Sequence, residues 1–140
     1  MKSKILKIVI SILLLVSIVL IYVVKTYNKP HLDTKNSKTD FTITAQKFIN
    51  EYLQDEISAD KKYAEKLIQV KGKIYNISTL KGDGVITLKF PGLESSIICY
   101  LLPEDNSKAL TLKKGQLISI KGICKGYLLD INMVKCVFVE

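Results

Sequence analysis

The sequence contains no arginine, and it has one histidine, three cysteines and three prolines. All of the positive charge behind the formal net charge of +8 therefore comes from lysine. Arginine is the residue that reads phosphate and guanine through paired hydrogen bonds, so this charge is weaker evidence for nucleic-acid binding than its size indicates. Because His31 is the single histidine and lies in a polar segment, we expect no Cys–His nucleophile pair.

Catalytic patterns are missing as well. The acidic residues Asp55, Glu56, Asp60 and Glu65 are interleaved with lysines, show no acid/base spacing and have no histidine beside them. We expect them to form a solvated helix end and turn. Residues 81–84 contain two glycines but lack the Gly-x4-Gly-Lys-Ser/Thr spacing of a phosphate-binding loop. The sequence therefore predicts no catalytic residue and no enzymatic activity.

One long hydrophobic run lies near the N-terminus. Residues 5–24 are almost wholly aliphatic, and from Ile8 onward the run carries no charge. A helix of this length spans about 30 Å, which matches the hydrocarbon core of a bilayer. Residues 1–25 are therefore predicted to be a transmembrane anchor that contacts the lipid bilayer through residues 5–24.

Two other interpretations of this run stay open: a cleaved secretory signal peptide and a buried helix of a soluble domain. Lys2, Lys4 and Lys7 resemble the basic start of a signal peptide, but the run is longer than the usual apolar region and ends without a small-residue cleavage site. Lysines lie on both sides of the run, so charge alone does not decide orientation. The short basic tail favours a single pass through the cytoplasmic membrane with the C-terminal domain extracytoplasmic.

The next segment, residues 26–40, is polar and holds Leu32 as its one aliphatic residue. Such a segment cannot bury enough apolar surface to offset its ordering entropy, so we predict a flexible tether. Its lysines either touch lipid headgroups or belong to a solvated spacer. Residues 1–40 hold seven lysines and two aspartates and so account for +5 of the +8 net charge. The domain predicted over residues 41–140 is therefore only mildly basic, which lowers the expectation of nucleic-acid binding.

This domain is predicted to open with a helix. Thr44 is the expected N-cap, and Ile43 is placed to contact Phe48 across the first turn. One side of the helix then carries apolar residues at helical spacing, namely Ala45, Phe48, Ile49, Tyr52 and Leu53. We expect this apolar side to pack against the rest of the domain.

From residue 67 onward the hydrophobic period changes from helical to two. The alternation predicts five strands, at residues 67–80, 85–90, 96–102, 117–125 and 131–139. A shift near Asn76 predicts a bulge or bend, and residues 103–108 favour a short helix or turn. Gly72 and Gly122, inside the first and fourth strands, are expected to let a small barrel coil tightly. The predicted fold is mainly β: a five-stranded OB-fold barrel with an N-terminal helix, preceded by a single transmembrane helix.

Six short segments carry a resemblance to a known family. They are residues 44–52, 59–63, 70–74, 99–100, 112–116 and 120–126. Together they resemble the tRNA_anti-like OB-fold family, whose members are mostly uncharacterised bacterial envelope or lipoprotein-like proteins. The resemblance covers roughly residues 42–138 and implies the fold rather than an activity, and it brings no catalytic residue. This chain departs from the lipoprotein-like members because no cysteine follows the apolar run to accept a lipid.

The three cysteines suggest one specific pairing. With a turn at residues 128–130, Cys124 and Cys136 are symmetric about residue 130 in a hairpin, so a disulfide between them is feasible in an oxidising exterior. The alternative is two buried free thiols. Cys99 is expected to be a core thiol. The cysteines and His31 lack Cys-x-x-Cys or Cys-x-x-His spacing, so the sequence predicts neither a metal site nor a cofactor.

If the domain binds a ligand as OB folds do, the binding surface lies on the second and third strands and on the loops between strands one and two and between strands four and five. The candidate residues combine lysines with tyrosines: Lys71, Lys73, Tyr75, Lys89, Tyr100 and Tyr127. Such a surface suits an oligosaccharide, a peptide or a single-stranded nucleic acid. We expect a non-catalytic envelope module for binding or scaffolding, with an oligosaccharide or peptide as ligand. The alternative is a single-stranded nucleic-acid-binding protein, which membrane placement disfavours.

Overall fold

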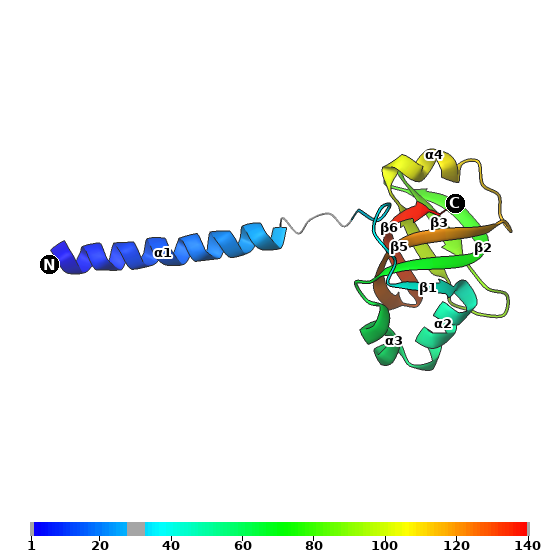
Figure 1. Cartoon of the computed structure of the whole chain (residues 1–140), viewed down its shortest axis with the longest axis horizontal. Coiled ribbons are helices and arrows are strands. Elements are labelled where there is room, and N and C mark those ends of the chain that lie inside the picture. The colour runs from blue at the N-terminus through cyan, green and yellow to red at the C-terminus, as the bar shows by residue number, and fades with distance from the viewer. Residues whose placement is uncertain (1, 28–32, 140) are drawn as a thin grey trace. The chain divides into compact units, whose positions relative to one another are not determined.

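The computed structural model describes residues 2–27 and 33–139, which divide into an N-terminal unit and a C-terminal domain (Figure 1). The N-terminal unit holds α1 (Lys2–Tyr27). Its residues Lys7–Val24 have a mean hydropathy of 2.9, and none of them is buried. By length and composition, this helix is apolar enough to cross a membrane.

The domain holds one closed sheet with helices at its ends. Its strands are β1 (Phe41–Thr44), β2 (Leu67–Leu80), β3 (Asp83–Leu88), β4 (Ile97–Leu101), β5 (Leu117–Leu128) and β6 (Asp130–Phe138). Its helices are α2 (Ala45–Gln54), α3 (Glu56–Tyr63), the 3-10 turn η1 (Pro103–Asp105) and α4 (Asn106–Ala109). Figure 1 shows α2 and α3 at one end of the sheet and α4 at the other.

The strands β2 to β6 form the predicted five-stranded barrel of an OB fold. They follow the order β2-β3-β4-β6-β5, and the pairing of β2 with β5 closes the ring. The long strand β2 pairs with both β3 and β5 because it bends. Its register with β3 shifts between Ile74 and Asn76, as predicted from the alternation. The barrel interior is apolar and is filled from every strand, with fully buried residues such as Ile68, Ile86 and Ile120.

The predicted N-terminal helix is present as α2. The Thr44 Oγ1 accepts a hydrogen bond from the Lys47 amide, as an N-cap does. The predicted apolar side is buried at its first four positions, but Leu53 is 49% exposed and lines a hollow at the surface. The helix ends one residue later and the chain turns at Asp55, so the last turn of α2 leaves Leu53 in solvent.

Two elements were not predicted. One is β1, a four-residue strand parallel to the start of β2. The other is α3, which occupies the segment expected to be a solvated helix end and turn. The Asp55 carboxylate caps it by accepting bonds from the Ser58 amide at 3.0 Å and the Ser58 hydroxyl at 2.6 Å. Ala59 and Tyr63, one helical turn apart, then bury the inner side of α3.

The segment between the two units differs from the predicted tether of residues 26–40. Residues 33–40 belong to the domain, where Thr34 is 1% exposed. The ammonium of Lys121 donates to the carbonyl oxygens of Lys35 at 3.0 Å and of Ser37 at 3.1 Å. Of the predicted tether, residues 33–40 therefore group with the domain, and residues 28–32 lie outside the described residues.

The predicted disulfide between Cys124 and Cys136 is wrong, because both cysteines are free and buried. The β5–β6 turn is centred on Leu129 rather than Asp130, and two register shifts follow along the hairpin. Cys124 therefore faces Met133, while Cys136 lies beside Leu101 of β4. Burial raises the pKa of both thiols, so at neutral pH they are protonated and unreactive core groups. Cys99 is also a free core thiol.

Aromatic side chains join α2 and α3 to the end of the barrel at which these helices lie. The ring of Phe48 meets Tyr63 edge-on at 5.0 Å, and the ring of Tyr52 stacks on Tyr127 of β5 at 5.6 Å. Such pairs each contribute about 0.5–1.5 kcal/mol beyond their buried area. The Tyr52 hydroxyl lies 3.4 Å from the Cys124 sulfur, and burial is the main cause that raises the pKa of Tyr52. The cluster fixes α2 against the barrel and thereby the surfaces on either side of it.

Candidate binding groove

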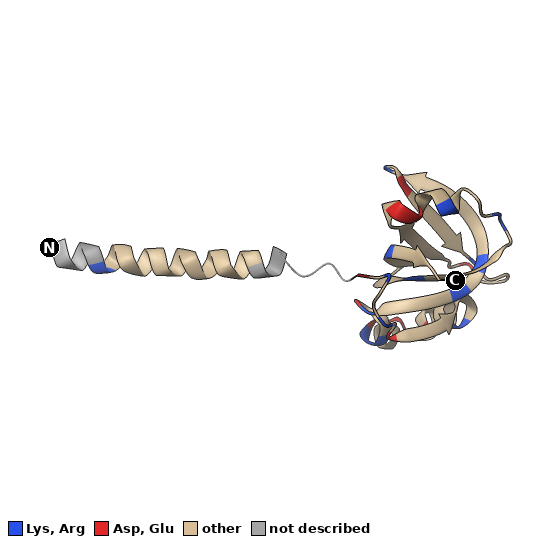
Figure 2. Ribbon diagram, turned by 45° about the horizontal axis from the view of Figure 1, so that its top comes forward, with Lys and Arg blue, Asp and Glu red and all other residues tan. Residues whose placement is uncertain are grey.

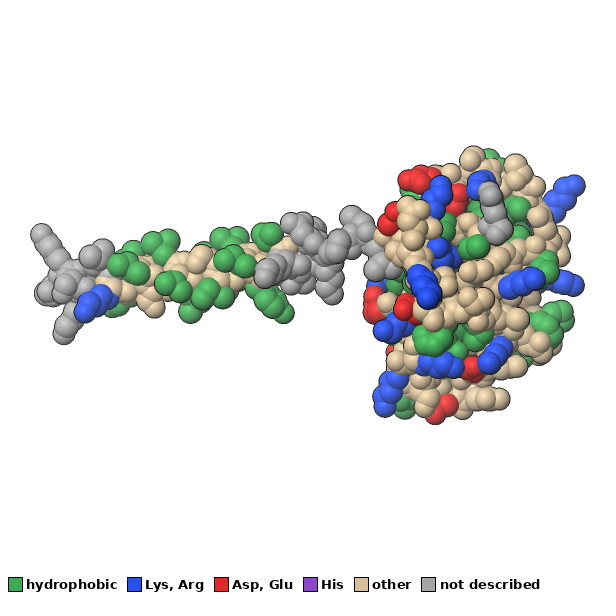
Figure 3. All heavy atoms as spheres, in the orientation of Figure 1, with side chains coloured by type: hydrophobic (Ala, Val, Ile, Leu, Met, Phe, Trp, Pro, Cys, Tyr) green, Lys and Arg blue, Asp and Glu red, His purple; other side chains and the backbone are tan. Residues whose placement is uncertain are grey.

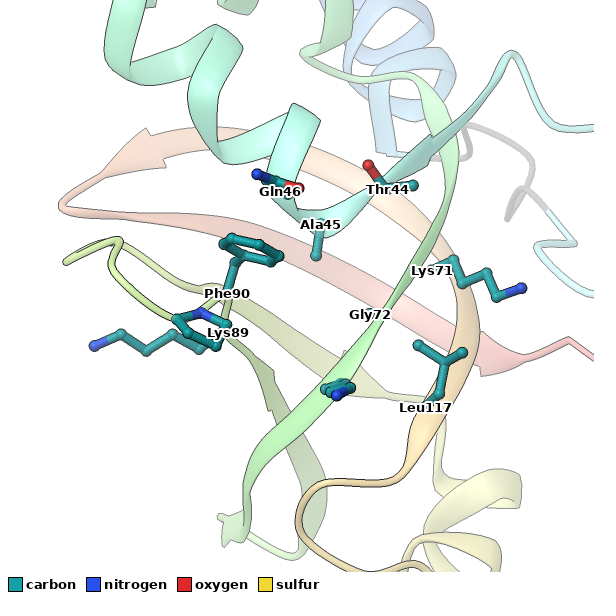
Figure 4. Close-up of a pocket in the computed structure, with 10 residues that line it drawn as sticks. Thr44, Ala45, Gln46, Lys71, Gly72, Lys89, Phe90 and Leu117 are labelled. Atoms are coloured by element: carbon teal, nitrogen blue, oxygen red, sulfur yellow. The ribbon is translucent and has the colours of Figure 1, made fainter.

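A groove of about 470 Å³ lies where the start of α2 crosses β2 (Figure 4). We call it the lysine groove. Its walls come from the start of α2, the middle of β2, the segment after β3 and the first residue of β5. It is lined by Thr44, Ala45, Gln46, Lys71, Gly72, Lys73, Lys89, Phe90, Pro91 and Leu117.

The floor of the groove depends on a close approach between α2 and β2. A Cβ atom added to Gly72 would lie 2.8 Å from the Ala45 Cβ, which is closer than real Cβ atoms come. The missing side chain at Gly72 therefore lets the first turn of α2 rest directly on the strand. The predicted role of this glycine was barrel coiling; the structure shows that it also admits the helix.

The charged residues that line the groove are all lysines. Lys71 and Lys73 point outward from β2 because they alternate with the buried residues Gly72 and Ile74. Figure 3 shows lysine side chains projecting from the side of the domain that carries β1, β2 and β5. None of the lining residues is acidic, and among the described residues Lys71, Lys73 and Lys89 take part in no ion pair. By contrast, Figure 2 shows acidic residues gathered at η1.

The centre of the groove is apolar. Phe90 is 37% exposed and Leu117 is 54% exposed, and Pro91 lies beside them. Figure 4 shows the Phe90 ring and the Ala45 side chain on one side of the groove and Lys71 with Leu117 on the other. Apolar walls with a cationic rim suit an anionic ligand that also carries apolar or ring surface.

The structure brings together four of the six predicted site residues. Lys71, Lys73 and Lys89 line the groove, and the Lys89 ammonium lies over the ring of Tyr75 at 5.3 Å from its centroid. Tyr75 is 59% exposed, so its outer ring surface is open to solvent. These four form a continuous lysine–tyrosine surface.

The other two predicted residues lie elsewhere. Tyr100 is half-buried on β4, where it pairs with Val85 of β3. Tyr127 is part of the aromatic cluster, and its hydroxyl is 2.8 Å from the Ser95 hydroxyl. Neither residue lines the lysine groove.

Two parts of the groove were not predicted from the sequence: the apolar wall that contains Phe90 and Pro91, and the contribution of α2. Phe90 and Pro91 follow the last residue of β3, and the run Phe90-Pro91-Gly92 reads as a strand end. An exposed aromatic next to such a breaker is the one feature that marks this wall. The contact between α2 and β2 has no local pattern, because it depends on the folded barrel.

Other chemistry near the groove is limited. The lining offers lysine, a threonine hydroxyl and an amide, but no carboxylate, thiol or imidazole. Within residues 33–139 the side chains of His, Cys, Asp and Glu form no group of three that would hold a metal ion. His31 lies outside the described residues.

The fold has counterparts among solved structures. A lipoprotein from Klebsiella pneumoniae subsp. pneumoniae, for which nucleic-acid binding is proposed, is 15% identical with a TM-score of 0.59, over 70% of this chain and 91% of its own. A protein from Leishmania major Friedlin assigned as an aspartyl-tRNA synthetase is 9% identical with a TM-score of 0.50, over 84% of this chain and 25% of its own. At these identities the likeness shows the fold alone. No curated protein matches.

The family is shown at the sequence level. The family model described as tRNA_anti-like matches residues 1–137, nearly the whole chain. The match takes in the helices and strands that build the groove. The chain therefore belongs to the tRNA_anti-like family.

Proposed function

We propose that this chain is a non-catalytic binding module of the cell envelope, anchored in the cytoplasmic membrane by α1 with its OB-fold domain on the extracytoplasmic side. The lysine groove then holds the ligand, an anionic oligosaccharide or an acidic peptide. The observation that carries this proposal is a set of three lysines around apolar groove residues, none of which pairs with an acidic group among the described residues. Like charges brought together without partners weaken the fold, and an anionic ligand offsets that repulsion.

Three further observations support the proposal. The helix α1 has the length and hydropathy of a membrane span. The similar structure from Klebsiella pneumoniae is that of a lipoprotein, a class of envelope protein. The groove also lacks a carboxylate, thiol or imidazole to act as a general base or nucleophile, which favours binding over catalysis.

Single-stranded nucleic acid is the second candidate ligand. It is favoured by the Lys89–Tyr75 pair, because a base stacks on an exposed ring while a lysine contacts the phosphate. The absence of arginine and the envelope placement argue against it. Both ligand classes use the same groove, so one experiment compares them.

The test is a binding titration of the full-length chain in detergent micelles. The probes are polygalacturonate, polyglutamate and a single-stranded dT oligonucleotide, each at low and high salt. We expect the double variant K71E/K73E to bind the preferred probe roughly tenfold or more weakly, because about 0.2–1 kcal/mol is lost per exposed charge contact and reversal adds repulsion.

The matched control is Lys114→Glu, an exposed lysine that does not line the groove. Binding that survives K71E/K73E, or that falls equally with K114E, would contradict the proposed groove. Preference for the dT probe over both other polyanions would replace the envelope ligand with nucleic acid.

A further inference from the structure

A second surface lies at the other end of α2. It is a hollow of about 500 Å³ between the last turn of α2, the segment after β3 and the β5–β6 turn. We call it the acidic hollow, because its lining contains acidic residues and no lysine. The lining residues are Leu53, Gly92, Leu93, Glu94, Ser95, Tyr127, Leu129 and Asp130.

The β5–β6 turn beside this hollow carries two leucines in succession, Leu128 and Leu129, which we call the leucine tip. Their side chains are 81% and 82% exposed, so they contribute almost nothing to the core of this domain. Leu129 has φ of 65°, a backbone conformation in which glycine or asparagine is usual at a hairpin turn. A bulky apolar pair at such a turn has no purpose in the isolated domain, which points to a contact outside it.

The base of the leucine tip is held rigidly. Asp130 accepts hydrogen bonds from the Ser96 amide at 2.6 Å and from the Ser96 hydroxyl at 2.7 Å. Tyr127, on the other side of the tip, bonds to Ser95 and stacks on Tyr52. The tip is therefore presented by a fixed scaffold, and little order has to be gained when it binds.

The lysine groove has the complementary properties. Its walls expose apolar surface at Phe90 and Leu117, and its rim is cationic without an acidic residue. The leucine tip is apolar and is flanked by Glu94 and Asp130 without a lysine in the lining of the hollow. An apolar centre with opposite charges at the two rims is the composition of a specific protein interface.

The groove and the hollow beside the tip are lined by successive parts of the same two segments. The helix α2 begins in the lining of the groove at Ala45 and reaches the hollow at Leu53. The segment after β3 does the same, because residues 89–91 line the groove and residues 92–95 line the hollow. Two copies facing each other about a two-fold axis can therefore place each tip at the partner copy's groove in one closed contact.

We propose that two copies of this chain form such a dimer, in which the leucine tip of each copy docks in the lysine groove of the other. This inference rests on the proposed function in one respect: the dimer covers the groove that would hold the anionic ligand. Ligand and dimer then compete, so self-association regulates access to the binding site.

The test measures association of the full-length chain in detergent micelles by light scattering and by chemical crosslinking. The tip variant is L128S/L129N, in which asparagine suits the left-handed turn and keeps the fold. The groove variant is K71E/K73E. We expect each variant alone to weaken dimer formation at least tenfold. The controls are Leu110→Ser, which changes a leucine as exposed as Leu128, and Lys114→Glu, and both should dimerise normally.

Mixing the two variants gives the sharper result. In the mixture, K71E/K73E supplies an intact leucine tip and L128S/L129N supplies an intact lysine groove. We therefore expect the two variants to form a one-to-one heterodimer through a single contact. A mixture that stays monomeric overturns the proposal, as does association that neither variant reduces, which would indicate contact through α1. Assemblies larger than a dimer in the unmodified chain overturn the two-fold arrangement.

The two proposals fail separately. The tip variant should bind the anionic probe at least as well as the unmodified chain, while the groove variant should lose both probe and dimer. Loss of probe binding in K71E/K73E without loss of the dimer leaves the proposed function standing and overturns this inference. Loss of the dimer in K71E/K73E without loss of probe binding leaves this inference standing and overturns the proposed function.

Discussion

At the scale of single residues, Gly122 of β5 is the glycine at which an added Cβ atom would come closest to a neighbouring atom, the sulfur of Cys136 on β6. A Cβ atom added to Gly122 would overlap the Cys136 sulfur and lie 3.1 Å from the Val134 carbonyl oxygen. Overpacking of this kind costs about 1–3 kcal/mol. We expect Gly122→Ala to lower the free energy of unfolding by about 2 kcal/mol, measured by urea denaturation with tyrosine fluorescence as the signal.

A second variant identifies the cause of this loss. Cys136→Ala removes the sulfur that the new methyl group meets, so the double variant should regain part of the stability that Gly122→Ala loses. The two changes are in contact and should therefore not be additive. Simple addition of the two losses would show that the methyl group is accommodated in another way.

The cysteines also show where prediction from sequence ends at this scale. Pairing Cys124 with Cys136 follows from counting outward from a turn at residue 130. The real hairpin turns on Leu129 in a left-handed conformation, and its register then shifts twice, between Tyr127 and Cys124 and between Ile123 and Lys121. Such shifts depend on backbone angles and packing rather than on residue numbers, and each one changes which side chains face each other.

At the scale of elements, Glu51 joins α2 to α3. Its carboxylate accepts hydrogen bonds from the Lys62 ammonium at 2.8 Å and from the Tyr63 hydroxyl at 2.7 Å. These contacts lower the pKa of Glu51 below its ordinary value of 4.5. The hydrogen bond from Lys62 has the largest effect, and the hydrogen bond from Tyr63 lowers the pKa further. A carboxylate with a lowered pKa in the folded state stabilises the protein above its unfolded pKa, and this stabilisation is lost as pH falls through the folded value.

The domain should therefore lose stability on acidification below pH 4.5, and Glu51→Gln should reduce the slope of that loss. Part of the slope remains, because hydrogen bonds also lower the pKa values of Asp33 and Asp55. The measurement is urea unfolding at a series of pH values from neutral to 3. Tyr63→Phe, which removes one donor, should give an intermediate slope, and an unchanged slope in Glu51→Gln would contradict the assignment.

The elements themselves were predictable to different degrees. The strands of the barrel were predictable because one side of each strand is buried, so apolar and polar residues alternate along the sequence. The helix α3 was missed although Asp55 with Ser58, and Ala59 with Tyr63, carry a capping pair and a one-turn apolar spacing. Charged residues stand between these positions, so the short pattern was not recognised as a helix. The strand β1 is four residues long and pairs with residues far along the chain, so no local pattern reveals it.

At the scale of the whole molecule, closure of the barrel decides which outward residues share a surface. The sequence identifies outward positions, and of the residues it proposes for the site, Lys71, Lys73, Tyr75 and Lys89 lie near one another on β2 and just after β3. Outward residues of different strands in a closed barrel point in different directions, so Tyr100 could not be placed from its alternation alone. Tyr127 lies outside the groove for another reason, because its ring stacks on Tyr52 of α2 and lines the hollow at the other end of that helix.

The proposed membrane anchoring and extracytoplasmic orientation of the domain are the last properties to test, and the native thiols cannot report them. Cys99, Cys124 and Cys136 are all buried, so a membrane-impermeant maleimide does not reach them in the folded domain on either side. An exposed reporter is needed, and Ser107 on α4 provides one. We expect Ser107→Cys to be labelled in intact cells, while Ser3→Cys in the basic N-terminal tail is labelled only after the cells are permeabilised. The opposite pattern would place the lysine groove in the cytoplasm, where polyanions are mainly nucleic acids and nucleotides. The dT probe would then become the relevant ligand for the groove, and the envelope oligosaccharide or peptide would be excluded.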